Sequence, residues 1–439
     1  MTDPTEGRGE EHAVLFPPTR ADALARLETF VPNAGRRYAN ERNRDPGPGP
    51  RGNVSMLSPY IRHRVITERE VLAAVLQQHP VQAAEKFIQE VFWRTYWKGW
   101  LQMRPQVWQA FLRERDADRE LLERSPGPRE AVACAEAGGT GIDAFDAWAR
   151  ELVQTGYLHN HVRMWFASIW IFTLRLPWSL GADFFLRHLL DADPASNTLG
   201  WRWVAGIQTP GKTYLARPDN IERYTGGRYR PDDLATEATP VRDETPPRPV
   251  QLAPPVHLPS GRPALLLLHG EDFTGHQLIP SGGEVHTAVI AASGHPDHPW
   301  PFGDRTRRFV ASLAADTAER LTRDAQANVH SIDALQADPI RKYCASACVR
   351  TIVTSEASVG PLADGLTRLA SELKDDGIEI VPLRRPWDDL AWPHATHGFF
   401  RFRQQIPELI ARNGLGTPDP RTEGQPLGHA ADLPPTESM

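Results

Sequence analysis

Ten of the thirteen tryptophans in this 439-residue chain lie between Trp93 and Trp203. Indoles are large and mostly apolar, so this concentration requires a sizeable packed core. Apolar residues at three- and four-residue spacing are typical of amphipathic helices. Four segments show that spacing, namely 21–30, 68–77, 82–100 and 144–155, and a fifth, 161–175, is apolar on nearly every face. The front half is therefore predicted to be helical, with the fifth helix buried.

The composition changes sharply after this region. Eight prolines fall between Pro240 and Pro263, which predicts an extended linker. Beyond it, short apolar runs alternate with helical patterns, an order that favours a doubly wound parallel sheet. The expected strands are 264–269, 287–292, 329–332, 351–353 and 378–381, and the expected helices are 306–323 and 360–373.

We therefore predict a multi-domain chain, with an all-α helical domain followed by an α/β doubly wound, Rossmann-like domain. The expected parts are a disordered N-terminus over 1–20, a helical domain over 21–231, a Pro-rich linker over 232–262, an α/β domain over 263–415 and a disordered tail over 416–439. No internal repeat is found.

Bulk properties narrow the class of protein. No apolar run approaches the ~18 residues of a membrane span, and the acidic start is unlike a signal peptide. Three cysteines fit a reducing cytoplasm, and a cytoplasmic monomer is expected. The net charge of −6 divides into +3 over 1–231 and −9 over the rest, which permits nucleic-acid contact without demanding it.

Four motifs follow one another in the helical half. They read VSMLSP over 54–59, EVFWRTYW over 90–97, TGYLHNHVRM over 155–164, and Asp191-Ala-Asp193 through Asn197 to Trp201-Arg-Trp203. Redox-active indoles around an Asn, an Arg and two Asp suggest a buried planar redox cofactor. In this order, the motifs strongly resemble the FAD-binding domain of DNA photolyases and cryptochromes. That family places an α/β antenna domain first, and the C-terminal half here is similar to that domain moved to the other end.

The resemblance implies a set of FAD contacts. Arg163 and Asp191 would form an ion pair beside the isoalloxazine, and Asn197 would contact its N5. Asp193 would lie near the adenine or ribose. The remaining implied contacts are Ser55, Leu57 and Ser58 at the diphosphate, together with Tyr38 and Arg94. Alone, the Arg163–Asp191 pair would read as an ordinary buried salt bridge.

The resemblance also implies a pocket for a cyclobutane pyrimidine dimer in DNA. Glu90 matches the acid that hydrogen-bonds the dimer, and Trp93 and Trp203 match the pair that sandwiches the flipped bases. Stacking on an indole is worth about 1–3 kcal/mol per base. Asn160 and Met164 match further pocket residues. Burial should raise the pKa of Glu90, so that it could donate a proton to the dimer carbonyl.

Three departures weigh against a simple transfer. His161 stands where dimer-repairing members have Arg, which would weaken a contact or make binding pH-dependent near ~6.5. Thr173 stands where another Asp is usual. Trp201 and Trp178 match the inner two tryptophans of an electron-transfer chain, but the third position, near Ser125, holds no Trp. Trp148 or Trp165 could replace it, or reduction follows another path.

Two functions compete on this basis. The first is a photolyase that uses FAD to split pyrimidine dimers. The second is a cryptochrome-type photoreceptor that binds FAD without repair, and a light-independent flavoprotein is a smaller third alternative. A hydrolase is disfavoured because the chain has no Gly-x-Ser-x-Gly. A second antenna chromophore between the domains is left open. Six basic residues could rim the cavity for DNA or simply face solvent: Arg202, Lys212, Arg217, Arg223, Arg228 and Arg230.

Overall fold

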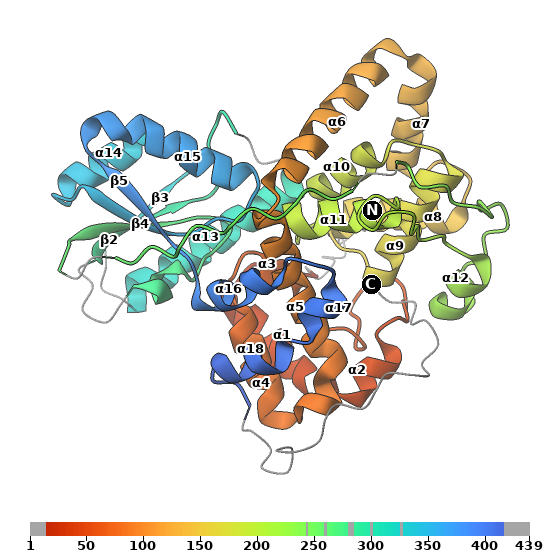
Figure 1. The fold of residues 1–439 in the computed structure, drawn as a ribbon, viewed down its shortest axis with the longest axis horizontal. Helices are drawn as coiled ribbons and strands as arrows, with labels where there is room; N and C mark the ends of the chain where they lie inside the picture. Colours follow the sequence, from red (N-terminus) through yellow and green to blue (C-terminus); the bar gives the residue numbers. More distant parts are fainter. Residues whose placement is uncertain are drawn as a thin grey trace, which may run out of the picture.

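The computed structural model describes residues 15–242, 245–258, 261–279, 285–298, 302–324 and 328–416. A helical region comes first and an α/β region follows (Figure 1). The helical region comprises α1 Arg20–Phe30, η1 Val31–Asn33, α2 Arg36–Glu41, α3 Ser58–Arg62, α4 Glu68–Gln78, α5 Val81–Gln102, α6 Pro105–Arg124, α7 Pro126–Ala137, α8 Asp143–Thr155, α9 Asn160–Ser168, η2 Ile169–Thr173, α10 Trp178–His188, α11 Pro194–Val204 and α12 Pro218–Thr225. No helix within the described residues is long and apolar enough to cross a membrane.

The α/β region is built on a five-stranded parallel sheet with strand order β3-β2-β1-β4-β5. Its elements are β1 Ala264–Leu268, η3 Gly275–Leu278, β2 Val285–Ala291, α13 Asp304–Asp324, β3 Asn328–Ile332, α14 Ala337–Ser346, β4 Thr351–Ser355, α15 Pro361–Leu373, η4 Lys374–Asp376 and β5 Glu379–Leu383. All five predicted strands are present; β1, β2 and β4 are largely buried, whereas the edge strands β3 and β5 are partly exposed. The order reverses between β1 and β4, where open α/β sheets commonly bind ligands.

Each face of the sheet packs into a different core. Alternate residues of β1 point to opposite faces. Leu266 and Leu268 join α13 in a core that continues into the helical region. Leu265 and Leu267 join α14 and α15 in a separate core on the other face. The sheet is therefore covered on both sides, as the sequence pattern predicts, and one of its faces is fused to the helical region.

After β5 the chain returns to the helical region. Three short helices, α16 Pro386–Ala391, α17 Phe399–Arg403 and α18 Ile406–Arg412, follow, with η5 Trp392–His394 between the first two. The ring of Trp387 stacks on Phe92 of α5 with centroids 4.9 Å apart, and its Nε1 donates to Thr95 at 2.9 Å. A Cβ on Gly99 of α5 would lie 2.9 Å from the Trp392 backbone. The last part of the predicted 263–415 range thus packs against α5.

The predicted boundaries at the ends need one correction. The prediction of disorder over 1–20 is wrong for the residues from 15 onward: Phe16 is buried, Thr19 caps α1, and Tyr60 donates to the carbonyl of Pro17 at 2.9 Å. Phe16 lies close to α1 in the sequence and packs into the core of the helical region. Residues 1–14 and 417–439 lie outside the described residues.

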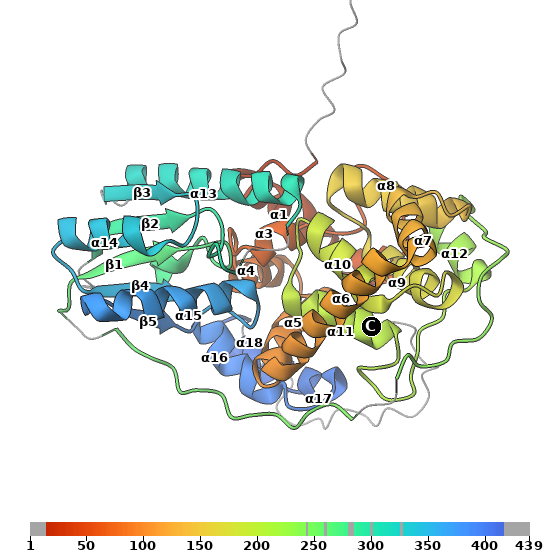
Figure 2. The same ribbon diagram turned by 90° about the horizontal axis from the view of Figure 1, so that it is seen from above.

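The Pro-rich segment crosses the outside of the molecule between the two regions (Figure 2). Its described residues, 232–242 and 245–258, form neither helix nor strand. It is attached at intervals, as Val241 N–H donates to the Ala205 carbonyl and Val250 N–H to the Met103 carbonyl. Proline cannot donate a backbone hydrogen bond, which explains why so few contacts of this kind hold it.

The predicted buried helix over 161–175 is divided. It runs as α9 to Ser168 and then as one π-helical turn, η2. Arg175 follows with φ 55°, a left-handed conformation that ends the helix. Single π-turns inside helices often occur at functional sites, and this one follows the helix that carries Arg163 and Met164.

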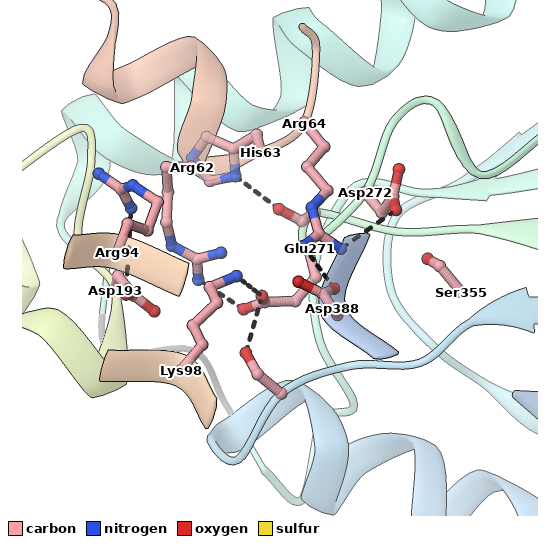
Figure 3. A network of polar contacts seen from close by, with 12 residues as sticks. Arg62, His63, Arg64, Arg94, Lys98, Asp193, Glu271, Asp272, Ser355 and Asp388 are labelled. Atoms are coloured by element: carbon pink, nitrogen blue, oxygen red, sulfur yellow. Dashed lines mark hydrogen bonds and ion pairs between the residues drawn. The ribbon is translucent and has the colours of Figure 1, made fainter. Parts of the chain in front are cut away.

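A buried network of charges joins the two regions at the carboxyl ends of β1 and β4 (Figure 3). We call it the polar joint and define it as Arg62, Arg64, Lys98, Glu271, Asp272, Arg385 and Asp388. Glu271 accepts hydrogen bonds from Arg62 at 2.5 Å, from Lys98 at 3.2 Å and from the Ser358 hydroxyl at 3.3 Å. Asp272 receives Arg385 through two nitrogens at 2.5 and 2.7 Å. Side chains of α3 and α5 therefore fill the place where the strand order reverses.

Candidate functional site

A cavity of about 260 Å³ opens within the helical region. Its wall is built by α5, α9, α11 and the loop that enters α3. Every FAD-contact residue expected from the sequence lines it: Tyr38, Ser55, Leu57, Ser58, Arg94, Arg163, Asp191, Asp193 and Asn197. Four segments separated in the chain thus converge on one cavity, which the resemblance implied but no single motif could establish.

The Arg163–Asp191 pair forms in this wall. Arg163 Nη2 donates to Asp191 Oδ2 at 2.9 Å, and its Nε donates to the Leu158 carbonyl at 3.0 Å. Burial would raise the pKa of Asp191, but Arg163, Arg94 and the Ser58 hydroxyl hold it below its usual range. The carboxylate is therefore ionised. Its Oδ1 is buried and accepts no hydrogen bond from the described residues.

Asp193, two residues after Asp191, is also a buried carboxylate of the cavity wall. It caps α11 by accepting the backbone N–H of Ser196 at 3.2 Å and the Ser196 hydroxyl at 2.6 Å, both on Oδ2. Burial again opposes ionisation, and the positive charges of Lys98, Arg62 and Arg94 lower the pKa. Within the described residues, its Oδ1 and the Nη1 of Arg94 have no hydrogen-bond partner. Buried polar atoms without partners are costly, so this wall is built to meet a polar ligand.

Two further groups face the cavity with hydrogen-bonding capacity. Asn197 donates from Nδ2 to the Ala182 carbonyl at 2.8 Å, which leaves its amide oxygen available. The loop 54–58 presents Ser55 and Ser58, and between them Met56 adopts φ 51°. A non-glycine residue in this left-handed region is uncommon and is most often kept where the backbone serves a site. The Asn197 amide could hydrogen-bond an amide-rich ring, and the loop 54–58 could bind a phosphate group.

Four of the five expected substrate residues also line the cavity. They are Glu90, Trp93, Asn160 and Met164. Asn160 is exposed and Glu90 and Trp93 are half-buried, so these three mark the mouth. Trp203 is different: it packs against Tyr214, with ring centroids 5.6 Å apart, and is not among the lining residues. The pocket therefore has one of the two expected tryptophans in its wall.

Glu90 has a partner that no motif indicated. Burial raises its pKa, as expected, and the guanidinium of Arg42 forms an ion pair with it that lowers the pKa again in part. Arg42 follows directly after α2, 48 residues before Glu90. Such a contact between segments 48 residues apart depends on the tertiary fold, and no motif or spacing in the sequence indicates it.

His161 does not behave as a cation at the mouth. Its ring stacks on Trp165 with centroids 4.2 Å apart, and its Nδ1 lies 3.0 Å from the Asn43 carbonyl oxygen. Burial lowers the pKa of His161 to about 4, with a smaller contribution from the charge of Arg42. The expectation that it would titrate near ~6.5 is therefore wrong, because the imidazole lies in an aromatic, desolvated position.

The aromatic residues behind the cavity follow a route that differs in part from the expected one. Trp201 lines the cavity, and its ring contacts Trp170 edge-on at 6.2 Å and Phe185 at 5.1 Å. Trp178 lies against Phe111 at 5.6 Å and donates to Glu114 at 2.7 Å. Trp170 was not expected beside Trp201. Its position 31 residues earlier in the chain gave no helical spacing from which to infer the contact.

Thr173 and the six basic residues singled out after Trp201 are not among the cavity-lining residues. Thr173 accepts the backbone N–H of Ala235 at 3.1 Å, and so contacts the Pro-rich segment instead of the cavity. Arg202 is buried, Arg228 pairs with Asp45 at 2.6 Å, and Arg230 pairs with Glu222.

The wall contains residues that the motif matches missed. Trp97 and Tyr157 both line the cavity. Trp97 is four residues after Trp93, so the helical period already placed it on the same face of α5. Tyr157 lies between two guanidinium groups, at 5.3 Å from Arg51 and 5.6 Å from Arg163.

Comparison with known proteins agrees with this geometry. Residues 87–224 match the family described as FAD binding domain of DNA photolyase. The chain is 32% identical over 217 residues to the deoxyribodipyrimidine photo-lyase of Alkalihalophilus pseudofirmus, covering 47% of this chain and 40% of that protein. It is 34% identical over 216 residues to a Thermus thermophilus enzyme of the same name, covering 48% of this chain and 49% of that protein. The chain thus spans about half the length of these curated relatives.

Among solved structures, a class III photolyase from Agrobacterium tumefaciens is 26% identical, with a TM-score of 0.37 over 48% of this chain and 43% of that chain.

Proposed function

We propose that this chain, whose residues 87–224 belong to the family of photolyase FAD-binding domains, is a light-driven flavoprotein that splits cyclobutane pyrimidine dimers in DNA. One observation carries the proposal. The cavity brings together the flavin-type wall of Arg163, Asp191 and Asn197 and the dimer-type mouth of Glu90 and Trp93.

The cavity wall fits FAD. Asp191 Oδ1, Asp193 Oδ1 and Arg94 Nη1 are buried atoms that lack hydrogen-bond partners among the described residues, and a polar cofactor would satisfy them. The Arg163–Asp191 pair and Asn197 would hold the ring system, and Ser55, Leu57 and Ser58 the diphosphate. When bound and reduced, FAD would supply a light-excited electron donor at this site.

The residues at the mouth have separate tasks in this proposal. Trp93 offers an indole face on which an extruded base can stack, which offsets part of the cost of removing it from the duplex. Glu90, whose pKa is raised by burial, can hydrogen-bond a dimer carbonyl. Asn160 and Met164 would complete the pocket. Trp201, with Trp170 or Trp178, would conduct electrons to the cofactor.

The test is repair of an oligonucleotide that contains one pyrimidine dimer, by the photoreduced protein, under blue light and in the dark. We expect light-dependent loss of the dimer. Glu90→Ala should lose most of this activity, and Glu85→Ala, an exposed carboxylate on the same helix, should keep it. Full repair by Glu90→Ala would overturn the assignment of the mouth.

A second candidate is a cryptochrome-type photoreceptor, which one observation favours. His161 is buried and neutral where a dimer-repairing enzyme of this type would place a cation. A photoreceptor would bind flavin and respond to light without binding dimer-containing DNA. A second antenna chromophore is compatible with either function.

A further inference from the structure

The short helix α17 is anchored on the cavity wall by one aromatic stack. The ring of Phe399 lies on Trp93 with centroids 3.6 Å apart and an interplanar angle of 13°. Phe399 also meets Tyr96 edge-on at 5.4 Å, and Phe402 meets Tyr96 at 5.4 Å. Both phenylalanines are buried. Because Trp93 is half-buried at the mouth, α17 stands directly beside it.

The opposite side of α17 carries an unusual combination of exposed groups. Phe400 is 67% exposed, and Arg401 and Arg403 are exposed on either side of the buried Phe402. The guanidinium of Arg403 lies 5.7 Å from the Phe400 ring centroid. In the part of the chain that the structure describes, neither arginine forms an ion pair with an acidic side chain. The contact found there for the Phe400 ring is the one with Arg403 of the same helix.

The charged side chains within the segment that carries α17 are all basic. Residues 390–407 contain two Arg and two His and no Asp or Glu, in a chain whose net charge is −6. An apolar partner would explain Phe400 but not two uncompensated arginines. A polyanion with exposed aromatic rings explains both, since arginine pairs with phosphate oxygens and phenylalanine stacks on bases.

We propose that α17 contacts the DNA duplex next to the extruded dinucleotide. This inference rests on the proposed function and extends it to a segment outside the residues that match the photolyase family. Arg401 and Arg403 bind backbone phosphates, and Phe400 stacks on the base that loses its neighbour when the dimer enters the cavity. Phe399, by stacking on Trp93, fixes α17 at the mouth so that both contacts form around one lesion.

The first experiment removes the two charges. The double variant Arg401→Gln/Arg403→Gln is compared with Arg129→Gln/Arg308→Gln, which removes two exposed arginines on α7 and α13. Figures 1 and 2 show α7 away from α17 in both views. Affinity for a duplex with one pyrimidine dimer is measured across salt concentrations. We expect the slope of log affinity against log salt to fall by about two for the α17 pair and to stay unchanged for the control pair.

The second experiment separates stacking from charge. Phe400→Ala should weaken binding of a dimer within a duplex about tenfold. It should affect a dimer in a single strand much less, because a single strand has no continuous stack to leave. Thermal unfolding and flavin content of each variant should match wild type, since all three side chains are exposed.

The results distinguish this inference from the proposed function. If the wild-type protein fails to bind dimer-containing DNA, the proposed function fails and α17 has no substrate to contact. If the wild type binds and the α17 variants match the control pair, the inference alone is overturned. It is also overturned if the variants change self-association in sedimentation and leave DNA affinity intact, because α17 would then be a contact between two copies.

Discussion

Glu271 and Asp272 of the polar joint differ from Asp191 and Asp193 of the cavity in how many of their carboxylate oxygens accept hydrogen bonds. At the joint, both oxygens of Glu271 and both oxygens of Asp272 receive donors. In the cavity, Asp191 and Asp193 each use one oxygen and leave the other buried without a hydrogen-bond partner among the described residues. All four are ionised, since neighbouring cations lower each pKa despite burial.

For these four carboxylates the difference separates a structural role from a binding role, although Asp388 Oδ1 at the joint also lacks a hydrogen-bond partner among the described residues. The joint occupies the place in the sheet where doubly wound proteins commonly bind ligands, yet protein side chains fill that place. The cavity has a similar set of paired charges, but Asp191 Oδ1, Asp193 Oδ1 and Arg94 Nη1 accept or donate no hydrogen bond among the described residues. Lys98 and Arg62 link the two, because both pair with Glu271 and both lower the pKa of Asp193.

The largest expected effect is at the joint. Glu271→Gln removes the charge that compensates Arg62 and Lys98, both of which are nearly inaccessible. Breaking a buried pair in this way should lower the free energy of unfolding by about 3–5 kcal/mol. Urea denaturation measures it. Glu379→Gln, which breaks an exposed pair with Arg262, should cost under about 1 kcal/mol, and equal losses in the two variants would refute the structural role.

A substitution in the cavity should lower cofactor affinity more than it lowers the free energy of unfolding. Asp191→Asn keeps the shape and removes a charge that faces the proposed cofactor. We expect FAD affinity to fall about 10- to 100-fold, as for the loss of a charged hydrogen bond. The free energy of unfolding of the apoprotein should fall less than in Glu271→Gln. Titration of apoprotein with FAD, followed by flavin fluorescence, measures it. Unchanged affinity would mean that the unpaired oxygen does not meet the ligand.

His161 tests whether its position between Trp165 and Tyr224 is desolvated, as the polar joint is. Its folded pKa of about 4 lies below the unfolded value, so the unfolded chain binds the proton first as pH falls. Stability from this group is complete above about pH 6.5 and is lost toward pH 4, with a change of about 2 kcal/mol between pH 7 and pH 5. His161→Gln should remove that part of the pH dependence. If both proteins lose stability equally over this range, the imidazole is not buried as described.

Arg42 gives the smallest expected effect. Arg42→Gln removes a cation that lowers the pKa of Glu90, so this pKa should rise further. If Glu90 acts as a hydrogen-bond donor, light-driven repair should continue to higher pH, with the decline displaced upward by about half a unit or more. The partly exposed pair should contribute at most about 1 kcal/mol to stability. A pH profile of repair identical to that of the wild type would show that Arg42 does not control the protonation of Glu90.

The sequence predicted more of the cavity than of its surroundings. The resemblance to the photolyase family named Arg163, Asp191 and Asn197, and the five strands followed from short apolar runs. Contacts between distant segments carried no such signal. The pairing of Arg42 with Glu90, the stack of Phe399 on Trp93 and the polar joint all depend on how distant parts of the chain come together. The role of Trp203 stays a prediction: its motif matched, and its side chain packs against Tyr214.

The measurement that tests the central claim most directly is the flavin content of the full-length protein, after purification and after incubation with FAD, in wild type and in Asp191→Asn. The account predicts one FAD bound per wild-type chain and a clear deficit in the variant at equal protein folding. A wild-type protein that binds no flavin, or a variant that binds it equally well, would contradict the assignment of the cavity.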